Sequence, residues 1–283
     1  MLQTRTLCSI RYNILLTYRP ARKSVERQHD CGSAEDRTGM SDEIVEIVNP
    51  DGPSPVLLVC EHASAAIPDE FDGLGLTATD RLSHAVWDPG AQAVAAHLSK
   101  LLDARLVSSR VSRLVYDANR PPDAFDAIPA RSERIEVPGN RALSDADRAA
   151  RTARFYEPFR AALAAEVARR PDPVIFTVHS FTPVYEGVPR AVEIGVLHDE
   201  DSRLADALLA SADRLGWQVA RNEPYGPQHG VTHTLKVHAL PHGHRNAMLE
   251  MRNDLIADEP AQRAMAQALA AWIGRTLAAE GLA

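Results

Sequence analysis

The stretch that decides the fold is PVLLVCEH, residues 55–62. Its first six residues form a continuous apolar run, which is typical of a strand buried on both faces of a parallel sheet. The run ends in a carboxylate and an imidazole, Glu61 and His62, where turn residues such as Gly or Asn usually stand. Because ligands bind beyond the carboxyl ends of parallel strands, this ending predicts a functional site. A solvated loop that begins at Glu61 is the alternative.

Similar apolar runs alternate with helical patterns along the rest of the chain. The runs predict strands over 43–49, 104–109, 174–179, 193–198, 217–222 and 247–252, and a strand with its exit over 112–120. Helical spacing predicts helices over 91–104, 144–170 with a kink at Pro158, 200–215 and 259–281. The proline-rich residues 121–141 predict a long surface loop. This order indicates one α/β domain with a mixed, mostly parallel sheet and helices on both faces.

Composition excludes several classes of function. The 283 residues carry a formal net charge of −7, and 5% of them are aromatic, so we expect no nucleic-acid partner. No segment approaches the roughly 18 consecutive apolar residues of a membrane span, so we expect no membrane partner. Three distant cysteines, Cys8, Cys31 and Cys60, form no CxxC pair, which favours a reducing, cytoplasmic setting. Cys60 lies within the apolar run and is expected to be a core residue.

The first 39 residues differ from the remainder. They are basic and lack a clear hydrophobic period, which predicts a disordered extension, and Met40 opens a natural start. A catalytic domain is therefore expected over 40–283. An organelle-targeting segment is the alternative for 1–39, because the stretch is rich in arginine.

Polar residues follow four of the predicted strands. These endings are Glu61-His62, Asn119-Arg120, His179-Ser180 and the pair Glu250 and Arg252. In a parallel sheet the carboxyl ends of neighbouring strands meet at one crevice. The crevice would then hold two imidazoles, several carboxylates and two or three guanidinium groups.

Two imidazoles and a carboxylate suit a catalytic Zn²⁺, which uses three protein ligands and water. His62 and His179 are the candidate imidazoles. Asp88, just before a predicted helix, is the favoured third ligand, and Glu61 competes with it. Adjacent side chains of a strand point to opposite faces, so Glu61 and His62 would rarely share one metal.

Other polar residues suit the remaining steps of a hydrolysis. Glu250 is the candidate general base for a zinc-activated water. Asn119 and Arg120 are placed to polarise a carbonyl or to hold a substrate carboxylate, with Arg113 and Arg252 as further clamps. Each arginine alone is equally consistent with a structural salt bridge.

A histidine-rich stretch precedes the Glu250 strand. Residues 228–248 contain His229, His233, His238, His242 and His244. Their spacing defines no single helix face, so a flexible loop that partly lines the substrate pocket is expected in preference to a second metal site.

Four motifs together resemble the N-formylglutamate amidohydrolase family. They are VCEHAS (59–64), SRLVYDANRP (112–121), HSF (179–181) and LEMRNDLI (249–256), and the similarity spans about residues 53–275. That family is similar to zinc carboxypeptidases and aspartoacylases, which implies their phosphorylase/hydrolase-like fold. The family's usual His-x-x-Glu is absent, because Ala65 stands where Glu would be, and Asp88 is the plausible replacement.

The resemblance implies a zinc-dependent hydrolase that splits N-formyl-L-glutamate into formate and L-glutamate, a last step of histidine degradation. It implies Zn²⁺ ligands at His62, Asp88 and His179 and catalysis by Glu250 with Arg120. Substrate carboxylates would be held by Arg113, Asn119, Arg120 and Arg252. Another N-acyl amino acid or small peptide as substrate, and a non-catalytic binding protein, are the alternatives. Monomer and homodimer are both open.

Overall fold

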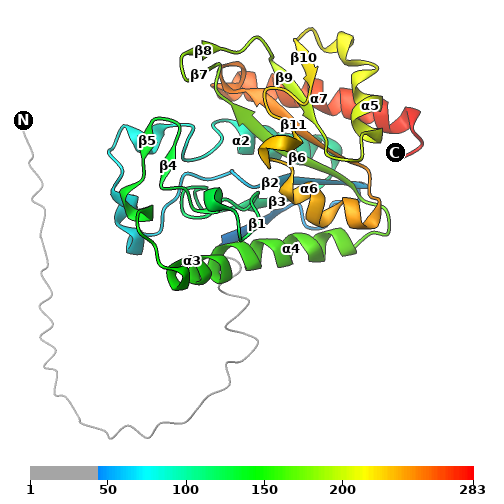
Figure 1. The fold of residues 1–283 in the computed structure, drawn as a ribbon. Helices are drawn as coiled ribbons and strands as arrows, with labels where there is room; N and C mark the ends of the chain where they lie inside the picture. Colours follow the sequence, from blue (N-terminus) through cyan, green and yellow to red (C-terminus); the bar gives the residue numbers. More distant parts are fainter. Residues whose placement is uncertain (1–43) are drawn as a thin grey trace, which may run out of the picture.

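The apolar run at residues 55–60 forms β2 (Val56–Cys60), and all five of its side chains are buried. In this computed structural model, which describes residues 44–283, β2 lies near the middle of a seven-stranded sheet (Figure 1). Cys60 is a free, buried thiol in the core, as expected. The extension predicted over 1–39 lies outside the described residues.

The sheet has the strand order β1-β3-β2-β6-β11-β9-β10. The other strands are β1 (Val45–Val48), β3 (Arg105–Ser109), β6 (Val174–Phe181), β9 (Ile194–Leu197), β10 (Val219–Arg221) and β11 (Asn246–Arg252). The four strands β3, β2, β6 and β11 are mutually parallel. The strand β1 runs antiparallel to β3, β9 runs antiparallel to β11, and β10 is parallel to β9. The predicted mixed, mostly parallel sheet is confirmed.

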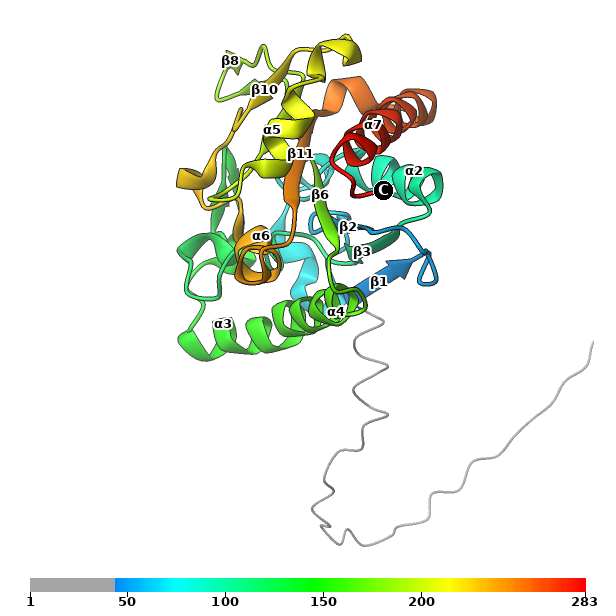
Figure 2. The same ribbon diagram turned by 90° about the vertical axis from the view of Figure 1, so that its right-hand side faces the viewer.

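Helices cover both faces of the sheet, as predicted (Figure 2). One face is covered by α2 (Ala91–Leu102), α5 (Arg203–Leu209) and α7 (Glu259–Ala279). The opposite face is covered by α4 (Glu157–Ala168) and α6 (His233–His238), and α3 (Asp145–Arg151) precedes α4 along the chain. Within residues 44–283 no helix combines the length and the apolarity that crossing a bilayer requires.

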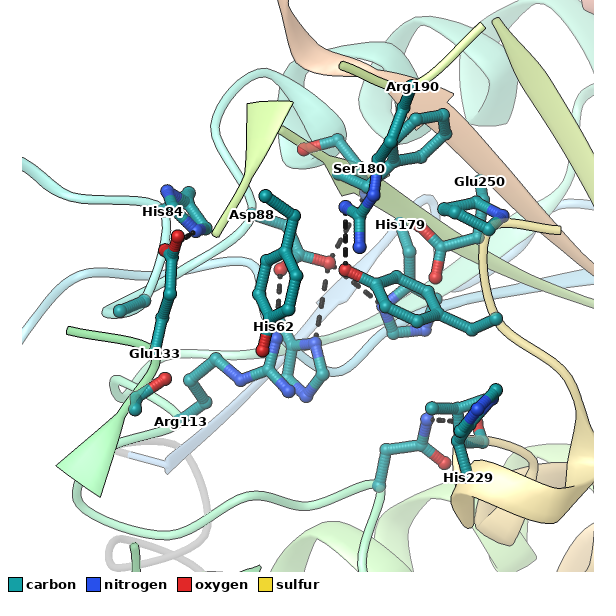
Figure 3. A pocket seen from close by; sticks show the side chains of 18 of the residues that line it. His62, His84, Asp88, Arg113, Glu133, His179, Ser180, Arg190, His229 and Glu250 are labelled. Atoms are coloured by element: carbon teal, nitrogen blue, oxygen red, sulfur yellow. Dashed lines mark hydrogen bonds and ion pairs between the residues drawn. The ribbon is translucent and has the colours of Figure 1, made fainter. Parts of the chain in front are cut away.

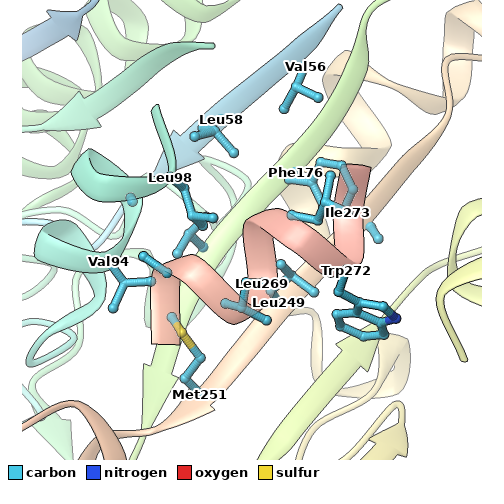
Figure 4. Packing of buried hydrophobic residues seen from close by; sticks show 14 of the residues in the cluster. Val56, Leu58, Val94, Leu98, Phe176, Leu249, Met251, Leu269, Trp272 and Ile273 are labelled. Atoms are coloured by element: carbon cyan, nitrogen blue, oxygen red, sulfur yellow. The ribbon is translucent and has the colours of Figure 1, made fainter. Parts of the chain in front are cut away.

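The packing of α2 and α7 against the sheet fixes the floor beneath the site. Leu98 of α2 and Ile273 of α7 meet strand residues such as Phe176 in one buried cluster (Figure 4). Burial of each such side chain contributes about 1.5–3 kcal/mol. Trp272 is fully buried as well, and its indole N–H donates to the carbonyl of Leu208 at 3.1 Å. This apolar layer holds the strands whose carboxyl ends carry the polar residues.

The prediction of a strand over 112–120 is wrong, because this segment forms a succession of turns. Its polar side chains provide the local hydrogen bonds that compete with a strand. The hydroxyl of Ser112 donates to the carbonyl of Val86, and the Asp117 carboxylate accepts from the backbone N–H of Asn119. The turns bring Arg113 and Asp117 toward the end of β2.

The predicted helices are broken in two places. A wide π turn over Thr152–Tyr156 separates α3 from α4, and Pro158 lies in the first turn of α4. Proline lacks the N–H that a continuous helix needs, so a widened turn before it is expected. The helix predicted over 200–215 is α5 followed by a 3₁₀ turn, Ala212–Leu215.

Two small hairpins were not predicted from the sequence. One joins β4 (Arg131–Ser132) to β5 (Ile135–Glu136) inside the proline-rich loop, and the other joins β7 (Val184–Tyr185) to β8 (Val188–Pro189). The backbone N–H of Glu186 donates to a carboxylate oxygen of Glu133 at 3.1 Å, which links the two hairpin turns. Both hairpins contribute residues to the cavity described next.

Candidate active site

Three residues that the sequence singled out converge at the carboxyl edge of the sheet (Figure 3). His62 follows β2, His179 lies near the end of β6, and Asp88 precedes α2. Their ligand atoms lie within 4.8 Å of one another, and all three residues are buried. The Asp88 Oδ2 atom is 3.3 Å from His62 Nδ1 and 2.9 Å from His179 Nδ1.

The backbone holds the Asp88 carboxylate in this position. The Asp88 N–H donates to the carbonyl of His62 at 3.0 Å, and the Ser180 N–H donates to Asp88 Oδ2 at 3.2 Å. Gly90 then turns the chain into α2 with a φ of 81°, a conformation that favours glycine. A Cβ at Gly90 would also lie 2.6 Å from the carbonyl oxygen of Ile256. The turn therefore depends on glycine.

A second carboxylate lies on the far side of each imidazole. His62 Nε2 is 2.7 Å from Asp117 Oδ1, and His179 Nε2 is 3.1 Å from Glu61 Oε2. Each ring is thus oriented by a carboxylate at Nε2 and presents Nδ1 to the centre of the cluster. Metal-binding histidines are commonly held in this way. Glu61, considered from the sequence as a competing ligand, lies behind His179, whereas Asp117 was not considered.

The surrounding carboxylates control the titration of the two histidines. Burial lowers the pKa of an imidazole, but carboxylates outweigh this effect, so the pKa of His62 is raised and that of His179 lies well above its usual value. Burial likewise opposes ionisation of Asp88 and Asp117, yet their ion pairs hold both pKa values below the usual range. The metal-free cluster therefore favours protonated imidazoles.

The donor set and its charge fit a divalent cation. Zn²⁺ prefers imidazole nitrogen and carboxylate oxygen, and a catalytic zinc site has three protein ligands and an open position. With neutral imidazoles, the carboxylates of Glu61, Asp88 and Asp117 and the guanidinium of Arg113 leave a net charge of −2. A divalent cation would balance this charge and displace the histidine protons. No second cluster of this kind is present among residues 44–283.

Glu250 lies beside this cluster at the floor of a cavity of about 480 Å³. It belongs to β11, where it is in register with His179 of β6 and Gly195 of β9. A Cβ at Gly195 would lie 3.2 Å from the Glu250 Cβ and closer still to the carbonyl oxygen of Glu223, so glycine leaves room for the acid. Burial raises the pKa of Glu250 to about 7. Its Oε2 has no hydrogen-bond partner in the described part of the chain.

The raised pKa of Glu250 predicts a cost in stability for the metal-free protein. The unfolded glutamate has a pKa near 4.3, so the raised pKa costs no stability below that pH, and the cost grows as the pH rises from there through about 7. Relative to wild type, metal-free Glu250→Gln should gain about 2–3 kcal/mol of unfolding free energy between pH 5 and pH 8. Urea unfolding of both proteins in chelator measures this gain. A difference that does not change with pH would contradict the assigned pKa.

The predicted substrate-binding residues fall into two groups. Arg113, Asn119 and Arg120 line the cavity, whereas Arg252 is not among its lining residues. Arg113 donates to Asp88 at 3.3 Å and to Asp117 at 2.8 Å, which raises the pKa of its guanidinium. The Asn119 amide bonds the backbone of the segment 231–234.

Arg252 instead extends away from the cavity. Its guanidinium pairs with Glu193 and Asp254 and donates to the carbonyl of Arg190 at 3.3 Å. The position of Arg252 therefore does not support its expected role in binding a substrate carboxylate, because neighbouring groups already occupy its guanidinium donors. Strand alternation does not account for this outcome, since Glu250 and Arg252 are two residues apart in β11 and share one face; the ion pairs of Arg252 with Glu193 and Asp254 do.

Several cavity residues escaped the sequence interpretation. They are His84, Ser132, Glu133, Tyr185, Arg190 and Tyr225, which come from turns and hairpins far apart in the sequence. The histidine-rich stretch was expected to line the substrate pocket in part, and its His229 does line the cavity. The stretch is more ordered than expected, because it contains α6 and its His238 and His244 are buried.

A mixed α/β sheet that carries a His–Asp–His cluster and a buried glutamate at one edge has the fold and site of a hydrolytic enzyme. A model of the N-formylglutamate amidohydrolase family matches residues 54–257, and the chain belongs to that family. The family acts on an amide bond by hydrolysis, and the resemblance drawn from the sequence motifs is confirmed.

Solved structures resemble this chain in sequence and fold. A gene product of Agrobacterium tumefaciens is 51% identical, with a TM-score of 0.84 over 86% of this chain and 98% of that chain. The N-formylglutamate amidohydrolase of Ralstonia eutropha JMP134 is 19% identical, with a TM-score of 0.59 over 82% of this chain and 99% of that chain, and shares the fold. A metallo-carboxypeptidase from Burkholderia cenocepacia, at 12% identity and a TM-score of 0.38, is too weak a likeness to support a shared mechanism. A search of curated proteins gave no match.

Proposed function

We propose that this protein is a zinc-dependent amidohydrolase that converts N-formyl-L-glutamate and water into formate and L-glutamate. The observation that carries the proposal is the buried cluster of His62, Asp88 and His179 beside Glu250 in a cavity rich in guanidinium groups. Family membership supports the amide bond as the reacting group. A role in histidine degradation and a cytoplasmic location belong to the same proposal.

The metal ion would be held by the Nδ1 atoms of His62 and His179 and by a carboxylate oxygen of Asp88. A bound Zn²⁺ supplies a Lewis acid, which polarises a carbonyl and lowers the pKa of water. Glu250 accepts the proton of the attacking water and later returns it to the leaving amine nitrogen. Its raised pKa suits both steps, because a group that titrates near 7 gains and loses a proton at little cost.

Arginines of the segment 112–120 would bind the substrate close to the reacting amide. Arg113 contacts Asp88, and Arg120 lines the cavity while it pairs with Asp126 at 2.8 Å. Arg120 would polarise the amide carbonyl or bind a carboxylate, and Arg113 would bind a carboxylate. Asn119 would affect substrate binding indirectly, because its side-chain amide holds the backbone of the segment 231–234 at the cavity.

The carboxylate behind His62 should matter for metal binding although it is not a ligand. Asp117→Asn removes the charge that orients the imidazole, so Zn²⁺ affinity should fall about 10- to 100-fold. Competition with a chelating dye measures the affinity, and Asp213→Asn, a change at an exposed residue of the 3₁₀ turn Ala212–Leu215, serves as the matched control. An unchanged affinity would show that Asp117 does not support metal binding by His62.

A panel of substrates tests the proposed acyl group. Formate release from N-formyl-L-glutamate is expected to exceed acetate release from N-acetyl-L-glutamate and cleavage of small dipeptides. Each product is quantified with the zinc-loaded protein at equal substrate concentration. A preference for an acetyl group or a peptide would contradict the proposed formyl substrate, although the protein would still be a hydrolase.

A further inference from the structure

The charges that line the cavity are unevenly compensated. Three arginines line it: Arg113 is paired with Asp88 and Asp117, Arg120 is paired with Asp126, and Arg190 completes the set. Among residues 44–283, Arg190 has no ion pair with a carboxylate. A guanidinium kept in a cavity without an acidic partner is a binding group for an anion.

Aromatic rings fix the position of the Arg190 guanidinium. Its central carbon lies 4.7 Å from the ring centroid of Tyr185, 4.8 Å from that of Tyr225 and 5.6 Å from that of Phe181. These cation–π contacts favour the charge without neutralising it. Its Nη1 donates to the Tyr225 hydroxyl at 3.0 Å and to the carbonyl of Thr182 at 3.3 Å. Figure 3 shows the side chain extending into the same cavity as Asp88 and Glu250.

The backbone of Arg190 is held as firmly as its side chain. Its N–H donates to the carbonyl of Pro183 at 2.8 Å, which closes the base of the β7–β8 hairpin. Its carbonyl accepts from Arg252 at 3.3 Å. Arg252, expected from the sequence to bind substrate, therefore acts here as a positioning residue for Arg190.

We propose that Arg190 and the Tyr225 hydroxyl form the subsite that binds the side-chain carboxylate of the substrate. The Tyr225 oxygen accepts from Arg190, so its own proton is available to a carboxylate oxygen. The remaining guanidinium donors of Arg190 supply charge-assisted hydrogen bonds to the same anion. Burial raises the pKa of Tyr225, which keeps the phenol protonated and able to donate.

The positions of the arginines indicate which substrate carboxylate each of them binds. The α-carboxylate is attached to the carbon that bears the reacting nitrogen, so it must stay near the metal cluster. Arg113 touches Asp88 of that cluster, whereas Arg190 contacts none of its three residues. The side-chain carboxylate is two methylene groups farther away, and the rings around Arg190 offer those methylenes an apolar wall. The subsite thus selects an acidic side chain.

The inference rests on the proposed hydrolysis of an N-formyl amino acid, and two substrates separate the claims. N-formyl-L-glutamine keeps the α-carboxylate and the formyl group but has a neutral side chain. With wild type, kcat/KM should be at least about 10-fold higher for N-formyl-L-glutamate than for N-formyl-L-glutamine. Arg190→Met should lower kcat/KM for N-formyl-L-glutamate by about 10- to 100-fold and leave that for N-formyl-L-glutamine nearly unchanged.

Additional variants exclude a general loss of folding. Tyr225→Phe should lower the preference for glutamate more mildly than Arg190→Met. Arg221→Met, an exposed arginine of β10 that pairs with Asp206, is the matched control and should behave as wild type. Calorimetric binding of the product L-glutamate against L-glutamine gives a readout without turnover, and Arg190→Met should abolish the difference between them.

The possible failures are distinct. Equal losses for both substrates in Arg190→Met, with normal melting temperature, would overturn the side-chain assignment. Unchanged kcat/KM for N-formyl-L-glutamate would overturn the subsite itself. A zinc-loaded wild type that releases no formate from either substrate would overturn the proposed function, and binding of L-glutamate would then decide the subsite alone.

Discussion

The Glu250→Gln protein is expected to keep its metal ion and to lose turnover by about 10²- to 10⁴-fold. Glutamine has nearly the same shape as glutamate but does not accept a proton from water. Glu250 is not one of the three clustered ligand residues, and it lies beside them in the buried floor of the cavity. The substitution thus separates proton transfer from metal binding.

Zinc content and initial rates of formate release, measured on the same preparation, check this expectation. Glu200→Gln, an exposed loop residue outside the cavity, is the matched control and should retain wild-type turnover. Full activity in Glu250→Gln would show that another group moves the proton. Loss of zinc together with activity would instead make Glu250 part of the metal site.

The second large effect is expected from the proposed ligands. His62→Ala and His179→Ala should each lose stoichiometric Zn²⁺ and nearly all turnover, because a three-ligand site that loses one imidazole keeps only two protein donors. The loss of affinity should exceed the 10- to 100-fold expected when an orienting carboxylate is changed.

Metal content after dialysis and kcat for N-formyl-L-glutamate measure the two effects together. His97→Ala, a partly exposed histidine of α2, is the control for the removal of an imidazole. Near-ultraviolet circular dichroism of the metal-free proteins confirms that each variant is folded. A His62→Ala protein that retained one tightly bound zinc would require a different set of ligands.

The fold was predictable because its signals are local. The run at 55–60 is apolar at every position, which marks β2 as central, and the helical spacing of 91–104 and 259–281 marks the helices that cover it. The segment 112–120 misled the interpretation because its apolar letters lie between side chains that bond the backbone locally. The bonds of Ser112 and Asp117 become visible only in three dimensions.

The site was predictable in part for the same reason. Residues that follow strands, such as His62 and His179, carry a positional signal. The alternation argument about Glu61 concerned a strand, but β2 ends at Cys60 and the chain turns at Glu61, so the period of two no longer applies. Arg190 had no signal, since its role depends on rings and a cavity assembled from distant segments.

Metal dependence is tested most directly by the rate of formate release from N-formyl-L-glutamate by one protein sample in three states: as purified, after chelation, and after addition of one equivalent of Zn²⁺. We expect release in the first state, loss in the second and recovery in the third. Release that continues undiminished in the chelated sample, after its zinc content has been shown to be negligible, would contradict a metal-dependent site at His62, Asp88 and His179.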